Sequence, residues 1–442
     1  MGSILFKLRL TAWLALAVGL LLPHAALGAG NGSFGATGAM GTARYGAAAA
    51  PLPDGRVLVA GGYNDEGGGH YLASAEAFNP STNAFSSTGI GAMSTARRGA
   101  VAAPLPDGRV LVAGGSYDDG TEHSLASAEV FNPATGAFTP VSSMTVARVR
   151  AAAAPLPDGR VLVAGGNNGS TRLLSAEVFT PSTGAFTPVN DMTADRAREA
   201  AAPLPDGRVL VAGGAAGANG AALQSAEVFN PATKSFSSAG IGAMGTARRA
   251  PAAAPLPDGR VLVAGGSNGD FGEHYLSSAE VFNPSTNSFS SVGIGAMGTA
   301  RTGAVAAPLP DGRVLLAGGF DGSTRFSSAE IFAATNAFSF AVKGRKLLMS
   351  VQATGKVSVS DAAARLGASA VKRKKQRLLL APSDGSGNPP TFTVPLHLSK
   401  LAKQRMRRTG RVAMRARITF VPQGGLASMQ TAKLRLKGKK KH

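Results

Sequence analysis

An arginine and a glutamate recur together at regular intervals along this 442-residue chain. An arginine stands four residues after a methionine six times, and a glutamate stands in the tripeptide Ser-Ala-Glu six times. A guanidinium and a carboxylate can either pair with each other or act on a ligand. The arginines are Arg44, Arg97, Arg148, Arg196, Arg248 and Arg301. The glutamates are Glu76, Glu129, Glu177, Glu227, Glu280 and Glu330.

These repeated residues have two interpretations. In the first, each arginine pairs with one glutamate and holds strands together, and the one-to-one ratio suits this because an unpaired buried charge is costly. In the second, the six arginines form a ring that clamps an anion. Repetition favours the structural interpretation, because repeat units reuse the residues that hold the repeat together. We therefore expect six structural ion pairs.

A second group of candidates lies in the segments that differ from one repeat to the next. Several of these segments combine acidic residues with histidine and tyrosine, which suits a carbohydrate or metal site with aromatic stacking faces. The alternative is that they are solvated loops, and no carboxylate spacing in them matches a calcium-binding loop. We therefore expect ligand recognition without a metal or another cofactor. The ligand-binding candidates are Tyr63, His70, Tyr117, His123, His274, Tyr275, Arg98 and Arg150.

The candidates are positioned by a sequence that the chain writes six times. Its first copy is PLPDGRVLVAGG, from Pro51 to Gly62, and successive copies begin about 50 residues apart. Pro-Asp-Gly is turn chemistry, and the apolar Val-Leu-Val-Ala that follows predicts a strand buried on both faces. With an apolar run before the turn, the Ser-Ala-Glu strand and a short strand at Phe85, each repeat supplies four strands. A four-stranded unit with this period predicts one blade of a β-propeller.

The repeat resembles the kelch family in its Gly-Gly pair, in the turn from Phe78 to Pro80 and in Phe85, where that family usually carries Trp. The resemblance covers about residues 31–340 and implies a six-bladed propeller. The segment from Asn31 to Phe34 imitates the fourth strand of a repeat but has no repeat of its own. Because an open blade leaves strand edges unpaired, we predict that Phe34 completes the sixth blade, whose other strands come from residues 301–332.

The beginning of the chain differs from the repeats. Residues 1–28 carry Lys7 and Arg9 before a short apolar run and end in small residues, which predicts a signal peptide. We therefore expect a secreted, extracellular protein, with the cell wall as one location. The mature chain has no other segment that is long and apolar enough to span a membrane, and the sequence contains no cysteine.

The segment from residue 339 to residue 436 is strongly basic. From Ala341 onward the chain has 24 Lys and Arg and only two acids, Asp361 and Asp384. Alternating apolar residues predict several strands, and residues 399–408 predict a short helix, so we expect a small β-sandwich and then a basic tail at 437–442. The NAFSF segment at Asn336 and the later LHLSKLAKQRMRRTGRV resemble the basic Ig-like C-terminal domains of exported actinobacterial proteins.

We expect this basic domain to adhere to anionic polymers of the cell envelope, because dense like charge destabilises a compact domain through self-repulsion. The alternative is that the charge serves solubility alone. We expect no nucleic acid partner, since the segment has few aromatic residues on which bases could stack.

The predicted organisation is all-β. It comprises a signal peptide (1–28), a six-bladed kelch β-propeller closed by an N-terminal strand (29–338), an Ig-like β-sandwich (339–436) and the tail. Kelch-type propellers include copper oxidases similar to galactose oxidase, whose cofactor needs a cysteine that this chain lacks. We therefore expect a monomeric, non-catalytic protein whose propeller rim recognises a glycan or a protein. The alternative is a carbohydrate-active propeller, similar to sialic-acid mutarotases, that uses rim Arg and Glu.

Overall fold

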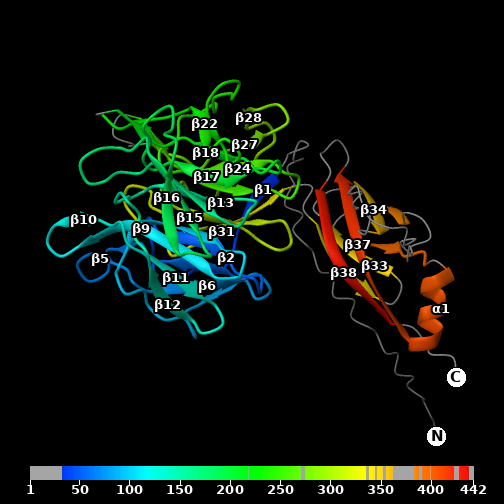
Figure 1. Cartoon of the computed structure of the whole chain (residues 1–442). Helices are drawn as coiled ribbons and strands as arrows, with labels where there is room; N and C mark the ends of the chain where they lie inside the picture. Colours follow the sequence, from blue (N-terminus) through cyan, green and yellow to red (C-terminus); the bar gives the residue numbers. More distant parts are fainter. Residues whose placement is uncertain are drawn as a thin grey trace, which may run out of the picture.

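The computed structural model describes residues 32–217, 219–269, 274–334, 338–343, 346–351, 355–361, 383–387, 391–398, 400–422 and 428–437. The predicted signal peptide and the tail beyond Lys437 lie outside the described residues. Figure 1 shows radiating sheets in the first part of the chain and a smaller, largely β domain at its end. Within the described ranges, no helix is long and apolar enough to cross a membrane.

Residues 32–334 form six antiparallel sheets of four main strands, one for each repeat. The first blade contains β2 (Ala48–Pro51), β3 (Val57–Ala60), β6 (Ala75–Asn79) and β7 (Ala84–Ser86). The second contains β8 (Arg98–Pro104), β9 (Val110–Asp118), β11 (Ala128–Asn132) and β12 (Ala137–Val141). The third contains β13 (Ala152–Pro155), β14 (Val161–Ala164), β15 (Ala176–Thr180) and β16 (Ala185–Val189). The fourth contains β17 (Ala200–Pro203), β18 (Val209–Ala212), β21 (Ala226–Asn230) and β22 (Ser235–Ser237). The fifth contains β23 (Ala252–Pro255), β24 (Val261–Ala264), β27 (Ala279–Asn283) and β28 (Ser288–Ser290). The sixth contains β29 (Val305–Pro308), β30 (Val314–Ala317), β31 (Ala329–Ala334) and β1 (Gly32–Ala36).

Small hairpins project between the second and third strands of several blades. Those in the described part of the chain are β4 (Tyr63–Asn64) with β5 (His70–Tyr71), the end of β9 with β10 (Glu122–Ser124), β19 (Ala215–Ala216) with β20 (Ala221–Ala222), and β25 (Ser267–Asn268) with β26 (His274–Tyr275). Because strand direction alternates within a blade, these rim hairpins lie at the same end of the propeller as the connections that enter each innermost strand.

The Pro-Asp-Gly turns lie at the opposite end. In the first blade the N–H of Gly55 donates to the Leu52 carbonyl at 3.0 Å, and the N–H of Arg56 donates to the Asp54 carboxylate at 3.0 Å. Gly55 has a φ of +89°, which a residue with a Cβ rarely adopts. A Cβ there would also lie 2.8 Å from Pro310 of the sixth blade, and the equivalent contact recurs at all six turns. The turns therefore form a close-packed ring.

The apolar core lies between neighbouring blades. The repeated Val-Leu-Val-Ala part of the second strands is buried, and in β3 the exposed fractions of Val57 to Ala60 do not exceed 1 %. The third-strand Phe of each of the first five blades contacts a fourth-strand Phe, with ring centroids 4.8–4.9 Å apart. In the sixth blade this partner comes from β1, where Phe34 lies opposite Phe332 with a centroid distance of 4.9 Å. The prediction that Phe34 completes the sixth blade is therefore confirmed.

The described residues between 338 and 437, where the sequence predicts a C-terminal domain, form two further sheets. One contains β32 (Phe338–Lys343), β33 (Lys346–Val351) and β36 (Thr391–Pro395), and the other contains β35 (Ser383–Gly387), β34 (Gly355–Asp361), β37 (Arg411–Pro422) and β38 (Ser428–Lys437). Both sheets and the helix α1 (Lys400–Thr409) bury side chains in one apolar core. Gly410 ends the helix with a φ of +68°, and its N–H donates to the Met406 carbonyl at 2.8 Å. An Ig-like fold for this domain stays a prediction.

Candidate functional site

The six repeated arginines are buried, and each forms an ion pair with the glutamate of its own repeat. Arg97 is 1 % exposed, and its Nη2 lies 3.1 Å from Glu129 Oε1. Its Nη1 donates to the carbonyls of Gly114 and Ser127 at 2.9 and 2.8 Å. The other five arginines make the corresponding contacts. Because these guanidiniums use their donors inside the blade, the interpretation of the six as an anion clamp is wrong.

The residues that follow the repeated arginines surround the propeller axis. Two positions after each arginine the backbone is left-handed, with φ between +51° and +66°. These six residues form a closed hydrogen-bonded ring, in which each N–H donates to the carbonyl of the preceding repeat at 2.7–3.0 Å. This axial ring consists of Gly46, Gly99, Arg150, Arg198, Ala250 and Gly303. It ties all six blades together.

Arg150 and Arg198 occupy places in the axial ring where three other repeats have glycine. A residue with a Cβ pays about 1 kcal/mol or more for a left-handed backbone. Backbone strain of this kind gathers at functional sites, where a side chain is needed in a place that the fold alone would leave to glycine. Ala250 has the same left-handed backbone with an apolar side chain, so the strain together with the guanidinium groups marks Arg150 and Arg198 as candidate site residues.

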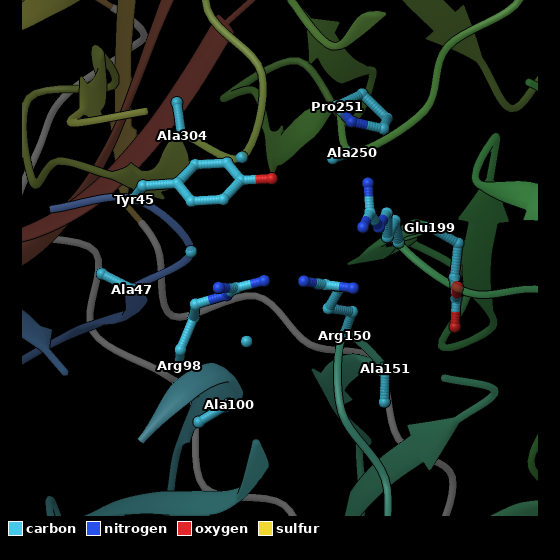
Figure 2. A pocket seen from close by; sticks show the side chains of 14 residues that line it. Tyr45, Ala47, Arg98, Ala100, Arg150, Ala151, Glu199, Ala250, Pro251 and Ala304 are labelled. Carbon is cyan, nitrogen blue, oxygen red and sulfur yellow. The ribbon is translucent and has the colours of Figure 1, made fainter. Parts of the chain in front are cut away.

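A pocket of about 110 Å³ opens at the axial ring. Arginines from three repeats line it, namely Arg98, Arg150 and Arg198, together with Tyr45 and Glu199. Figure 2 shows the guanidiniums of Arg98 and Arg150 and the hydroxyl of Tyr45 pointing toward its centre. Within the described residues, no carboxylate lies at ion-pair distance from any of the three arginines, and the buried Nε of Arg98 makes no hydrogen bond.

The arginines give this axial pocket a strongly positive potential. Burial, followed by the charge of Arg198 and then that of Arg98, lowers the pKa of Arg150 to about 10. Burial and other arginines, Arg249 first among them, lower the pKa of Arg198 to about 10 as well. Burial would raise the pKa of the Tyr45 phenol, but the nearby arginine charges outweigh it and lower that pKa. A pocket with this potential suits an anion.

Aromatic rings flank Arg98 on the side of the first blade. The Arg98 guanidinium carbon lies 5.7, 5.5 and 5.6 Å from the ring centroids of Tyr45, Tyr63 and Tyr71. Each cation–π contact of this kind contributes about 0.5–1 kcal/mol at a partly exposed site. The three tyrosines therefore hold the Arg98 guanidinium in place, and Tyr45 is the one of them that also lines the pocket.

Two carboxyl groups near the pocket differ in protonation. Burial would raise the pKa of Glu122, but its hydrogen bond from Ser116 and the charges of Arg98 and Arg150 lower it. Burial raises the pKa of Glu199 to about 8, so this carboxyl is largely neutral at pH 7. Neither Glu199 oxygen makes a hydrogen bond of ordinary geometry, and Figure 2 shows the carboxyl turned away from the pocket centre.

The structure separates the predicted ligand-binding residues into two groups. Arg98 and Arg150 line the pocket. The other six lie on rim hairpins and do not line it, although Tyr63 contacts Arg98 and Tyr275 packs edge-on against Phe320 with centroids 5.8 Å apart. The remaining four of these six are His70, Tyr117, His123 and His274.

Sequence reasoning missed Tyr45, Arg198 and Glu199. A signal for them was present, because the three residues after each repeated arginine differ between repeats that are otherwise close copies. These triplets are Tyr-Gly-Ala, Arg-Gly-Ala, Val-Arg-Ala, Ala-Arg-Glu, Arg-Ala-Pro and Thr-Gly-Ala. Residues that serve the blade are repeated six times, so charged residues that appear in single repeats point to a site that is not six-fold.

Comparison with known proteins supports this architecture. A model of the kelch motif matches residues 44–88, 97–145, 148–193 and 248–293. The solved structure of YjhT is similar with a TM-score of 0.56 and 14% identity, over 71% of this chain and 99% of that chain. A fungal alcohol oxidase of the AA5 family, in complex with copper, is similar with a TM-score of 0.52 and 15% identity, over 91% of this chain and 99% of that one. No curated protein sequence matches. The chain contains a kelch β-propeller, as its sequence predicts.

The alcohol oxidase corrects one prediction. We expected a non-catalytic protein, but a solved neighbour with this fold is an enzyme, so that expectation is contradicted. Copper itself does not fit the axial pocket, because arginine side chains dominate its polar lining and would repel a metal cation. Among the residues that the structure describes, no three His, Asp or Glu gather where they could hold a metal ion. We therefore derive no chemistry through copper.

Proposed function

We propose that the axial pocket binds a sugar that bears a carboxylate and that the propeller acts on this sugar. The observation that carries the proposal is the convergence of Arg98, Arg150 and Arg198 without a carboxylate partner among the described residues. Guanidiniums bind carboxylates through paired, charge-assisted hydrogen bonds. The kelch fold is typical of proteins that bind other proteins or ligands, and this pocket gives the present propeller a specific place for an anion.

Tyr45 supports a sugar as the rest of the ligand. It is the tyrosine that lines the pocket, so a ligand whose carboxylate meets the arginines would have its ring beside the Tyr45 side chain. Tyrosine combines an apolar face with a hydroxyl, and a pyranose combines apolar C–H groups with hydroxyls in the same way. The pocket volume of about 110 Å³ suits the charged end of such a ligand, with the remainder in the open mouth.

The specific reaction that we propose is the interconversion of sugar anomers, as in a mutarotase. In this reaction the anomeric hydroxyl loses a proton, the bond from the anomeric carbon to the ring oxygen breaks, and the ring oxygen gains a proton. Closure on the other face gives the second anomer, so atoms and electrons balance. The Tyr45 phenol lines the pocket and has a lowered pKa, so it suits the acid that protonates the ring oxygen, while solvent in the open mouth takes the proton of the anomeric hydroxyl.

Calorimetric titration of the full chain with N-acetylneuraminate tests the binding step, with the neutral sugar N-acetylmannosamine as comparison. We expect only the acid to bind, and we expect Arg150→Ala to weaken binding at least tenfold through the loss of charge-assisted hydrogen bonds. The matched control is Arg109→Gln, which removes an exposed arginine from a turn at the other end of the propeller. Equal binding of both sugars, or equal effects of both substitutions, would contradict the proposal.

Anomer exchange followed by proton NMR tests the reaction separately. We expect the full chain to accelerate exchange of N-acetylneuraminate above its spontaneous rate, and Tyr45→Phe to reduce this rate while binding persists. Binding without acceleration would leave the anion site in place and remove the mutarotase-like reaction.

We also propose that the chain is exported and that its basic C-terminal domain retains it at anionic polymers of the cell envelope. The support is the charge of that domain together with the predicted signal peptide. A test is the fractionation of cells that express the full chain, in which the protein should accompany the envelope and be released by salt. Recovery of the protein in the cytoplasm would contradict it.

A further inference from the structure

The strands β37 and β38 form a ribbon at one edge of the second sheet, and the two faces of this ribbon differ. Side chains of Val412, Met414 and Leu434 are buried, with exposed fractions of 5 % or less. The intervening residues point to the other face, because side chains alternate along a strand. Their exposed basic members are Arg411, Arg417, Lys433 and Arg435. We call this surface the basic ribbon face.

The register brings like charges together on the basic ribbon face. Arg411 pairs with Lys437 in the ladder, so it is a diagonal neighbour of Arg435, and Arg417 is likewise a diagonal neighbour of Lys433. Diagonal neighbours on a sheet lie about 7–8 Å apart, and Arg411 and Arg417 lie about 20 Å apart along the strand. Among the described residues, no ion pair involves any of these four side chains. Their repulsion opposes the fold unless an anion neutralises it.

The domain has little that could stack on a base. The chain contains no Tyr or Trp after Tyr275, and Phe420 on β37 is buried in the core. Binding of single-stranded nucleic acid relies on exposed aromatic rings as well as positive charge. The basic ribbon face offers the charge without the rings, so a polyanion without bases is the partner that it fits.

We propose that the basic ribbon face binds a linear phosphodiester polymer with a polyol backbone. Phosphodiester groups are ionised at every physiological pH and accept paired hydrogen bonds from arginine, which supplies three of the four cations. A repeating polymer can meet the two diagonal pairs in succession along the strand direction. This proposal rests on the proposed retention at the envelope and names the surface and the polymer chemistry responsible for it.

The test measures binding of the purified full chain to poly(glycerol phosphate) over a salt series. One variant combines Arg411→Gln with Arg435→Gln on the basic ribbon face. The matched control combines Lys400→Gln with Lys403→Gln on the exposed side of α1, so both variants lose two positive charges from the same domain. A third variant, Arg150→Ala, disables the axial pocket and separates this proposal from that of the pocket. Circular dichroism confirms that each variant is folded.

We expect the ribbon variant to bind about tenfold more weakly and with a shallower salt dependence, because two counterion-releasing contacts are lost. We expect the α1 variant to change affinity less than about threefold at the same salt, and the pocket variant to bind like the original chain. Equal weakening by the ribbon and α1 variants would overturn the proposal in favour of net charge alone. Tighter binding of single-stranded DNA than of poly(glycerol phosphate) would overturn it in favour of a nucleic acid surface.

Discussion

Arg97 and Arg98 are adjacent in the chain, and their surroundings are opposite. Arg97 is buried inside its blade, pairs with Glu129 and donates to two carbonyls. Arg98 is half-buried at the axial pocket, faces three tyrosine rings and has no carboxylate partner among the described residues. The first environment recurs in all six repeats, whereas the second occurs once. In this molecule the repeated residues build the blades, and the departures from the repeat build the site.

The largest expected effect comes from removing a repeated arginine. Arg97→Met leaves the carboxylate of Glu129 buried without its partner, which costs about 3–5 kcal/mol in the free energy of unfolding. Urea unfolding followed by circular dichroism measures this loss. Unchanged stability together with lost sugar binding would reverse the comparison and give Arg97 the functional role.

A substitution at Glu199 tests whether a residue that differs from the repeat lowers the free energy of unfolding. Its pKa is raised from 4.5 to about 8, so the unfolded chain releases this proton first, and stability falls as the pH rises between these values. Four other repeats have alanine at this position. We expect Glu199→Ala to remove most of a pH-dependent loss of about 3 kcal/mol between pH 5 and pH 8, as measured by urea unfolding at each pH. Parallel pH profiles for the two chains would show that Glu199 is hydrated and not the source of the loss.

Arg198→Gly separates stability from binding at one residue. Glycine occupies this place of the axial ring in three other repeats, so the substitution relieves left-handed strain and should stabilise the chain by about 0.5–1 kcal/mol. The same change should weaken binding of N-acetylneuraminate more than tenfold, because a guanidinium is lost from the pocket. Thermal unfolding and calorimetric titration measure the two effects. Loss of stability with unchanged binding would place Arg198 with the repeated arginines.

The smallest expected effect is that of Arg109→Gln. Arg109 pairs with Asp107 at 2.7 Å, but both side chains are about 40 % exposed or more. An exposed ion pair contributes less than about 1 kcal/mol, so stability and sugar binding should both stay close to those of the original chain. A large change in either quantity would show that the Pro-Asp-Gly end of the propeller contributes more than the comparison allows.

Most of the propeller could be predicted from the sequence, because its information is local and written six times. The Pro-Asp-Gly turn fixes a backbone that few other residues adopt, and Val-Leu-Val-Ala suits only a strand with both faces buried. The place of Phe34 could be predicted for a different reason. It imitates a strand that an open sixth blade lacks, and the closed ring requires such a strand. The end of helix α1 could also be predicted, because a glycine that adopts the left-handed conformation, here Gly410, commonly terminates a helix.

The axial pocket could be predicted only in part. Arg98 and Arg150 were among the candidates, but the rim histidines were given equal weight although they lie on separate hairpins. Which side chains meet at the axis depends on the rotation of one blade to the next, and this rotation is a property of the closed ring. Sequence spacing gives the arrangement of residues within one blade, so it does not predict that Tyr45 lies near Arg98 and Arg198 of other blades.

The pairing of β1 with β31 sets the order of events when the chain is made. Gly32 leaves the ribosome first, and its partner Ala334 follows about 300 residues later. At bacterial and eukaryotic synthesis rates the wait lasts between about 15 and 60 seconds. During this time β1 has no partner in its own chain, and the first complete β31 that it meets can belong to another copy. Closure within one chain succeeds because its own β31 arrives tethered to five folded blades, at a local concentration that a second molecule does not reach.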